Sequence, residues 1–470
     1  MSSNPLAPVT DALLTALEAV VGTANLKRGA AVAAMDTGWH PHNLGAGIVI
    51  APGSTAEVAE VVRLCAAQRV PLVPQGGRTG LVGGSISAPG EIVLSSARLQ
   101  RIVRLDATER VAVVEAGCTL EALQQAAAAL QLEPGIDLAA RGSATIGGMV
   151  ATNAGGVMAF RNGVMRHRVL GLEAVLPDGS VMSDLTRVVK NSAGYDLKQL
   201  FIGAEGTLGF VTQVALKLDP LPAASATALF GLPSVAAALA LVRRALDPMA
   251  GHLRAAEALW QRYIRLTADA LHWSDAGMPL EQPIYLLLGL GGSDEAALRN
   301  AFETLYEQAL QAHPQTTGLV AASARQERAL WRLREDTDIL YRAHPAAPSY
   351  DVSVPLSAIE RYAAGVQAGL AALDATLQPY LFGHLADGNL HIVLNREGPL
   401  PQALSAAVEQ VLYRELPALG GSFSAEHGVG SKRIGSMFDT VDATKLALMA
   451  RVKQLFDPAR EMNPGKVLPD

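Results

Sequence analysis

The sequence has few of the features that mark several large classes of protein. It contains only two cysteines, Cys65 and Cys118, which is too few for a four-cysteine zinc site or an iron–sulfur cluster. We expect no disulfide between them, because large chains in reducing compartments rarely form one. No apolar run reaches the length of about 18 residues that a membrane-spanning helix needs. The sequence therefore predicts neither a cysteine-built metal centre nor a membrane span.

Charged residues are also scarce. They make up 17% of the chain, with a net charge of -6 and no long run of one sign. No basic patch of the kind that binds nucleic acid is present. The first 21 residues include acidic side chains and no positive cluster before an apolar stretch, so we expect no secretory signal and a cytoplasmic protein.

The chain is rich in apolar residues and in glycine. Half of the 470 residues are apolar, enough for more than one core. Apolar periodicity predicts helices over 10–22, 54–68 and 120–130, and strands over 70–74, 91–94, 102–105 and 111–114. A boundary is expected at 219–222. Beyond it, helices over 234–246, 294–310 and 322–341 alternate with strands over 284–290 and 350–354, which indicates a second α+β domain.

The first glycine-rich run follows the strand over 70–74 directly. Five glycines lie within nine residues, and Thr79 and Ser85 add hydroxyl groups. Such a loop can hold a diphosphate with its backbone N–H groups, although an ordinary flexible loop has the same composition. It is not a Walker loop, because no Gly-Lys-Ser/Thr follows, and its glycine spacing differs from the dinucleotide fingerprint.

Two further glycine-rich runs favour a cofactor that extends across several loops. The run 141–156 combines glycines with Ser143, Thr145 and Asn153, and a third run spans 194–209. Together, the three runs resemble the FAD-binding domain of the p-cresol methylhydroxylase and vanillyl-alcohol oxidase superfamily. The ending 456–466 is similar to the C-terminal tail of that family, whose matching residue, Asn463, returns to the isoalloxazine.

The resemblance implies that the first run holds the diphosphate and the second lines the flavin. Many members attach FAD through a histidine in the first loop, and 74–85 contains none, so we expect FAD to be bound non-covalently. The cofactor-binding residues that the resemblance implies are Pro74, Gln75, Gly76, Gly77, Thr79, Gly80, Leu81, Ser85, Gly142, Ser143, Ile146, Gly147, Gly148, Asn153, Gly155, Glu205 and Asn463.

A histidine pair flanks a turn signal in the second half. Asp387-Gly388 predicts a two-residue hairpin loop, which would place His384 directly opposite His391 on one sheet face. Directly opposed Cβ atoms lie about 4.5–5.5 Å apart, a suitable separation for two imidazoles to bind one metal. A satisfied surface pair of histidines would give the same pattern.

The run 424–430 supplies a third candidate ligand, Glu426, next to His427. Two histidines and one carboxylate leave open positions, as catalytic zinc sites do. These motifs resemble the C-terminal half of the D-2-hydroxyglutarate and D-lactate dehydrogenase family. The resemblance implies that His384, His391 and Glu426 bind a divalent metal, usually zinc, and that Asn389 and His427 lie at the substrate. Asn389 is also a typical turn residue.

The stretch 330–337 is similar to the same family and supplies Arg334 and Thr337 as further substrate residues. On one helix, residues three apart share a face, and an arginine can hold a carboxylate bidentately. An arginine paired with a neighbouring acid on the surface is the alternative. One departure concerns Ser349, because hydroxyglutarate dehydrogenases of the family often carry Lys at this position whereas D-lactate dehydrogenases tend to lack it.

The family implies a two-domain α+β flavoprotein: a helical segment over 1–40, a p-cresol methylhydroxylase-type FAD-binding domain over 41–220, a substrate domain with the metal site over 221–430, and a tail over 431–470 that returns to the FAD. The expected activity is metal-assisted oxidation of a D-2-hydroxy acid such as D-2-hydroxyglutarate, D-lactate or D-malate. A glycolate oxidase-type subunit and a transferase like alkylglycerone-phosphate synthase are alternatives. We expect a homodimer that passes electrons to an electron-transfer flavoprotein, a quinone or a cytochrome.

Overall fold

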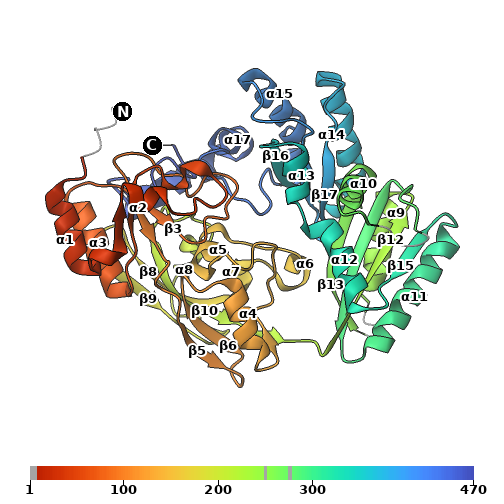
Figure 1. Cartoon of the computed structure of the whole chain (residues 1–470), viewed down its shortest axis with the longest axis horizontal. Helices are drawn as coiled ribbons and strands as arrows, with labels where there is room; N and C mark the ends of the chain where they lie inside the picture. The colour runs from red at the N-terminus through yellow and green to blue at the C-terminus, as the bar shows by residue number, and fades with distance from the viewer. Residues whose placement is uncertain (1–7, 248–250, 274–277, 470) are drawn as a thin grey trace. The chain divides into compact units, whose positions relative to one another are not determined.

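The computed structural model describes residues 8–247, 251–273 and 278–469, which divide into two compact units (Figure 1). Unit 1 comprises Met1–Gly156, Asn162–Leu221 and Glu426–Asp470, and unit 2 comprises Val157–Arg161 and Pro222–Ala425. Within these described ranges, no helix is both long and apolar enough to cross a membrane.

Unit 1 contains two larger sheets. In the first, β2, β4 and β3 run parallel and β1 pairs antiparallel at one edge; the order is β1 (Leu26–Arg28), β2 (Ile48–Ile50), β4 (Ile92–Ser95), β3 (Leu72–Gln75). The second is antiparallel, in the order β5 (Ile102–Asp106), β6 (Val111–Glu115), β10 (Phe210–Lys217), β8 (Val169–Val175), β9 (Val181–Asp184). A short ladder joins β7 (Leu132–Glu133) to β11 (Asp219–Pro220). The expected strands are confirmed to within one or two residues.

Local capping chemistry sets where the main helices of unit 1 begin. Thr10 and Ser54 each accept a hydrogen bond from the backbone N–H three residues ahead, so the chain turns into helix at these positions. The apolar faces of α1 and α3 pack into one core with β3 and β4. The helices are α1 (Asp11–Val21), α2 (Ala30–Ala33), α3 (Thr55–Ala67), α4 (Leu120–Ala128), α5 (Ile146–Thr152), α7 (Met165–Arg168), α8 (Lys198–Phe201), α17 (Ile434–Thr440) and α18 (Ala443–Phe456), with α6 (Ala159–Asn162) at the change of unit and 3-10 turns at Thr23–Asn25 and Pro41–Leu44.

Unit 2 is built on one antiparallel sheet. Its order is β15 (Thr317–Val320), β12 (Ala224–Leu232), β14 (Ile284–Gly292), β13 (Gly251–Trp260), β17 (Tyr380–His384), β18 (Asn389–Val393), β16 (Ser349–Ser353). Its helices are α9 (Val235–Ala245), α10 (Gln261–Ala270), α11 (Glu295–Ala312), α12 (Ala324–Glu335), α13 (Asp338–Ala343), α14 (Ile359–Leu373), α15 (Gln402–Tyr413) and α16 (Leu416–Leu419), with a 3-10 turn at Leu356–Ala358.

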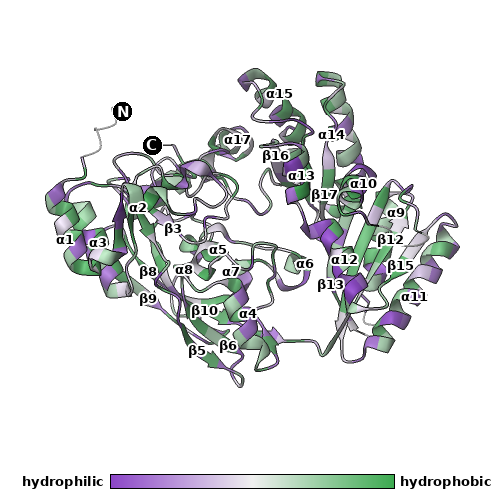
Figure 2. Ribbon diagram, viewed as in Figure 1, coloured by the Kyte–Doolittle hydropathy of each residue, from purple (hydrophilic) through white to green (hydrophobic). Residues whose placement is uncertain are grey.

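Helices cover both faces of the central strands in unit 2. Leu229 on β12 packs into the cluster formed with α10, α12 and α13, whereas the ring of the next residue, Phe230, lies 6.2 Å from Phe302 on α11. Strands buried on both faces read as continuous apolar runs, which explains the run predicted over 284–290. Figure 2 shows mostly hydrophobic strands in this sheet and alternating hydrophilic and hydrophobic stretches along α11.

The single helix predicted over 322–341 is wrong, because the structure divides it into α12 and α13. The carbonyl oxygen of Arg334 accepts a hydrogen bond of 3.0 Å from the Tyr263 hydroxyl, at the place where a continuous helix would use the N–H of Asp338. Asp336 and Thr337, which favour helices only weakly, form the break. Thr337 therefore does not share a helix face with Arg334.

The C-terminal segment is fastened to the strand that leads into the first glycine run. The N–H of Leu72 on β3 donates to the carbonyl of Glu461, and the N–H of Asn463 donates to the carbonyl of Leu72. Lys453 on α18 lies behind this segment, where its ammonium group donates to the carbonyls of Thr207 and Met462 and contacts Asp457 at 2.5 Å.

Replacing Asp457, which is 1% exposed, with Ala should destabilise unit 1 strongly. The change removes the counter-charge of Lys453 and the acceptor of the Met462 N–H. Breaking a buried ion pair from one side costs about 3–5 kcal/mol. Chemical denaturation should show this loss, whereas Asp442→Ala, at the exposed N-cap of the same helix, should cost only about 1 kcal/mol. Equal losses in the two variants would contradict the prediction.

Candidate active site

The first two glycine-rich runs pack against each other in unit 1. A Cβ atom on Gly77 would lie 1.9 Å from the carbonyl oxygen of Ser143, and one on Gly76 would lie 2.2 Å from the Thr145 hydroxyl. Only glycine permits this approach of two backbones. The loops are therefore not flexible connections but two sides of one built site.

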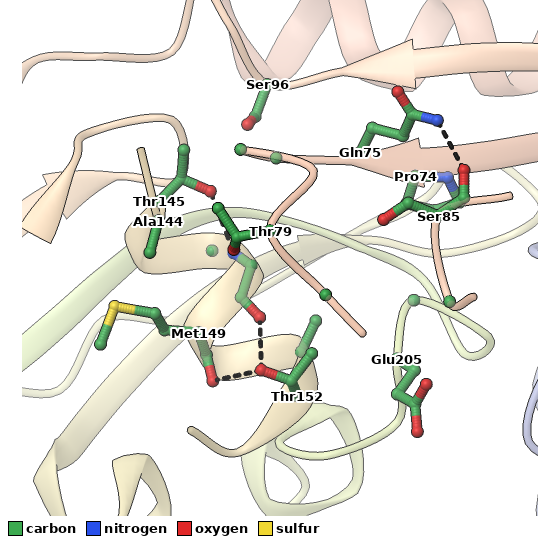
Figure 3. Close-up of a pocket in the computed structure, with 18 of the residues that line it drawn as sticks. Pro74, Gln75, Thr79, Ser85, Ser96, Ala144, Thr145, Met149, Thr152 and Glu205 are labelled. Atoms are coloured by element: carbon green, nitrogen blue, oxygen red, sulfur yellow. Dashed lines mark hydrogen bonds between the residues drawn. The ribbon is translucent and has the colours of Figure 1, made fainter. Parts of the chain in front are cut away.

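These loops line a cavity with an empty volume of about 1070 Å³, part of which is open to solvent. Figure 3 shows residues of the first loop and of α5, with its cap Thr145, around the same pocket. The predicted cofactor residues that line it are Pro74, Gln75, Gly76, Gly77, Thr79, Gly80, Ser85, Gly147, Gly148 and Glu205.

The lining has unsatisfied hydrogen-bonding capacity. Within the described residues, Gln75 Oε1, Arg78 Nε and Ser96 Oγ are buried and have no hydrogen-bond partner. Buried polar atoms are rarely left without a partner in a finished site. The polar groups of FAD could satisfy these atoms. Figure 3 shows both Gln75, which the sequence predicted as a cofactor residue, and Ser96, which it did not.

Several predicted cofactor residues do not line this cavity. Ile146 is 1% exposed within the apolar core, and Asn153 caps α5 in a left-handed conformation and accepts the N–H of Arg166. Asn463 donates to the carbonyls of Gly84 and Glu205. Leu81, Gly142, Ser143 and Gly155 are likewise absent from the lining.

Glu205 binds the segment that carries His427. Its carboxylate accepts hydrogen bonds of 2.7 Å from the N–H of Val429 and 2.9 Å from that of Gly430. Burial raises the pKa of Glu205, and these two N–H groups act against that rise. His427 itself lines the cofactor cavity, and its neighbour Glu426 accepts the N–H of Gly156 at 2.7 Å. The predicted base therefore borders the predicted flavin site.

In unit 2, the hairpin brings the two histidines together, but not in the predicted register. The β17–β18 ladder pairs Phe382 with His391, so the connection is longer than the two residues expected, and His384 is not directly opposite His391. Relative to the predicted pairing, the ladder is displaced by two residues. Because side chains alternate between faces, a shift of two leaves both histidines on the same face of the sheet. The centroids of the two imidazole rings accordingly lie 5.5 Å apart, and the ring planes make an angle of 81°.

Each histidine has a buried carboxylate at its Nδ1 atom. Glu257 Oε1 lies 2.7 Å from Nδ1 of His384, and Asp351 Oδ1 lies 3.4 Å from Nδ1 of His391. Histidines that bind metals commonly donate one ring N–H to a carboxylate, which leaves the other nitrogen to the metal. Both carboxylates are 0% exposed. Their position makes this pair unlike two satisfied surface histidines.

Glu257 was missed by the sequence analysis. It lies on β13, paired with His384 on β17, and its second oxygen lies 2.7 Å from Nε of Arg334. Burial alone would raise the pKa of Glu257, but His384 and Arg334 outweigh it and hold the pKa below its ordinary value. A lone acid in an apolar strand is the one signal that the sequence offered.

Arg334 and Asn389 each contact one of these two buried carboxylates. Arg334 is 8% exposed and paired with Glu257, so the alternative of a surface ion pair is wrong. Asn389 donates to Asp351 at 2.6 Å, and no described residue donates to its own buried Oδ1. The amide N–H of Ala425, the residue before Glu426 and His427, also donates to Asp351.

Comparison with known proteins identifies the class. Residues 46–184 match the FAD binding domain family, and residues 221–467 match the family of FAD linked oxidases, C-terminal domain. Two solved structures share the fold: p-cresol methylhydroxylase with substrate bound, with a TM-score of 0.74 at 16% identity over 98% of both chains, and alkyldihydroxyacetonephosphate synthase, with a TM-score of 0.73 at 15% identity over 99% of this chain and 88% of that one.

The chain is also similar to proteins named D-2-hydroxyglutarate dehydrogenase. It is 39% identical to the one of Xanthomonas citri pv. viticola over 91% of this chain and 90% of that protein, and 36% identical to the mitochondrial one of Bos taurus over 90% and 77%. The one of Stutzerimonas stutzeri is 31% identical over 89% and 90%. The chain belongs to this family of FAD-linked oxidases, which confirms the resemblance drawn from its motifs and the predicted fold class.

Replacing Gly77 with Ala should abolish tight FAD binding. The added Cβ would lie 1.9 Å from the Ser143 carbonyl and must force the two glycine-rich loops apart. We expect the Kd for FAD to rise at least about tenfold, which corresponds to about 1.4 kcal/mol. Titration of the apoprotein with FAD, followed by flavin fluorescence, measures this. Gly435→Ala on α17, where an added Cβ meets no atom within 4 Å, should bind FAD as the wild type does. Wild-type affinity in the Gly77 variant would show that the loops tolerate separation.

Proposed function

We propose that the protein oxidises a D-2-hydroxy acid to the 2-oxo acid, with non-covalent FAD in unit 1 and a divalent metal, zinc by preference, at the histidine pair of unit 2. The observation that carries the proposal is the pair His384 and His391, each supported by a buried carboxylate, in a chain that also has a flavin-type cavity. The named activity of the relatives supports the substrate class.

The donor set fits a divalent metal. With both Nδ1 atoms directed at carboxylates, the two Nε2 atoms are the nitrogens that remain to bind an ion. Glu426 is the proposed third ligand, and it directly follows Ala425, whose N–H is held by Asp351 beside His391. A metal held by these residues would supply a Lewis acid for the hydroxyl and carboxylate oxygens of the substrate.

The remaining roles belong to side chains of this chain. His427 removes the proton of the 2-hydroxyl group, for which an imidazole has a suitable pKa near neutral pH. Arg334 holds the substrate carboxylate, and Asn389 and Thr337 contribute polar contacts to the substrate. FAD, when bound, supplies the acceptor for the hydride that leaves C2, so loss of that hydride and of the hydroxyl proton gives the 2-oxo acid.

Several finer parts of the proposal come from the sequence. The first loop, 74–85, lacks a histidine, which favours non-covalent FAD. The domains at 1–40, 41–220, 221–430 and 431–470, the homodimer and the separate acceptor, an electron-transfer flavoprotein, quinone or cytochrome, stay predictions. The histidine pair with carboxylate support, a set suited to a divalent metal, favours a dehydrogenase over a transferase with this fold.

The substrate is proposed to be a monocarboxylic acid of the D-lactate type. Ser349 shares a sheet face with Asp351, two residues along β16, and Asp351 contacts His391. Ser349 bonds with the Tyr341 hydroxyl rather than offering a positive charge. A second carboxylate, as in D-2-hydroxyglutarate, therefore finds no lysine at this position.

The function is tested by anaerobic mixing of the oxidised holoenzyme with D- and L-2-hydroxy acids. Of D-lactate, D-malate and D-2-hydroxyglutarate, D-lactate should bleach the flavin fastest, and the L-enantiomers should not bleach it. Removal of metal by a chelator should slow bleaching at least about 100-fold, because a Lewis acid contributes several kcal/mol, and added Zn²⁺ should restore the rate. No bleaching by any hydroxy acid would refute the activity, and bleaching that is indifferent to the chelator would refute the metal.

Replacing Ser349 with Lys should shift specificity toward the dicarboxylate. A charge-assisted hydrogen bond contributes about 1.5–3 kcal/mol, so kcat/KM for D-2-hydroxyglutarate relative to D-lactate should rise about tenfold or more. Ser225→Lys, at an exposed position on β12 of the same sheet, is the control and should not produce the shift. An unchanged ratio for Ser349→Lys would mean that this position does not face the distal end of the substrate.

A further inference from the structure

Glu257 connects two functions that the proposed mechanism keeps separate. One carboxylate oxygen lies 2.7 Å from the ring of His384, a proposed metal ligand, and the other lies 2.7 Å from Nε of Arg334, the proposed carboxylate-binding residue. Each partner contacts its own carboxylate oxygen, which is the arrangement expected of a rigid bridge. An acid that only neutralised the charge of Arg334 would not need to contact His384 as well.

The surroundings prevent this bridge from moving. Glu257 is 0% exposed on β13, a strand paired on both sides, with β14 and β17. The guanidinium of Arg334 also lies over the ring of Phe382, 5.0 Å from its centroid, and Tyr263 bonds to the Arg334 carbonyl. Side chains packed in this way have few alternative rotamers, so the orientation of one partner constrains the other.

Both partners need a fixed orientation. His384 binds a metal through Nε2 only when its proton is on Nδ1, and a carboxylate at Nδ1 holds that tautomer. Arg334 has one N–H on Nε and four on its terminal groups. Because Nε is directed at Glu257, the plane of the guanidinium and the direction of the terminal groups are set by the same carboxylate.

We propose that Glu257 is a positioning residue that aligns the metal ligand His384 and the substrate-binding Arg334 as one unit, so that metal and substrate carboxylate are held at a fixed separation. The inference rests on the proposed function and adds a shared control point to it. Because its two oxygens face His384 and Arg334, Glu257 would act on metal and substrate only through these two neighbours.

The test uses two readouts on Glu257→Gln. The metal-free protein is titrated with Co²⁺, and the visible absorption of the bound ion gives a Kd without any turnover. The KM for D-lactate is then measured at saturating metal. We expect the Kd for Co²⁺ to rise about 10–100-fold, the usual effect of removing such a support. We also expect the KM to stay at least about tenfold above the wild-type value when metal is saturating.

The second readout separates the shared role from a simpler one. If Glu257 supported only His384, saturating metal would restore the wild-type KM, and the inference would be overturned. It would be overturned equally by a wild-type Kd for Co²⁺. Glu257→Asp keeps the charge but is one methylene shorter, so it cannot reach both partners. At least one readout should remain altered in this variant, which decides the matter if the glutamine variant does not fold.

Two controls complete the experiment. Glu327 lies on the same helix as Arg334, and its carboxylate accepts a hydrogen bond from the Thr227 hydroxyl. In Glu327→Gln both readouts should stay at wild-type values. His384→Ala tests the proposed metal site itself and should lose Co²⁺ binding. Retained Co²⁺ binding there would refute the site, whereas loss there with unaltered Glu257 variants would refute only the bridge.

Discussion

The chemistry of unit 2 depends on the cost of burying charge. Glu257 has no exposed surface, and an unpaired carboxylate in such a place would be strongly unfavourable. Both of its oxygens therefore need hydrogen-bond donors, and in this fold the donors are Arg334 and His384. Removing one partner from a buried set of this kind leaves an uncompensated charge. The requirement for charge balance thus fixes the arginine and the histidine together.

Unit 1 uses the same principle for a different purpose. Glu205 is buried at the cofactor cavity, and its carboxylate accepts the backbone N–H groups of Val429 and Gly430, while the positive charges of Arg433 and Lys466 also favour its ionised form. Its carbonyl accepts the side-chain amide of Asn463 from the C-terminal segment. Residues distant in sequence are in this way held at one cavity.

Local features were predictable from the sequence and distant pairings were not. The caps at Thr10 and Ser54 act over three residues, so the local pattern is enough to indicate where these helices start. The break after α12 depends on Tyr263, some seventy residues earlier, and no local signal predicts it. Glu257 acquires its role only through pairing of β13 with β17. The hairpin register was wrong because Asp-Gly indicated a turn without fixing its length.

The segment between the two units shows how these constraints combine. Ala425, the last residue of unit 2, donates its N–H to the buried Asp351 beside His391. Four and five residues later, Val429 and Gly430 donate to the buried Glu205. Glu426 and His427 therefore lie on a short stretch anchored at each end by a buried carboxylate. Within each unit a buried carboxylate restricts the backbone next to these two residues, so Asp351 and Glu205 limit the conformations open to the proposed metal ligand and base.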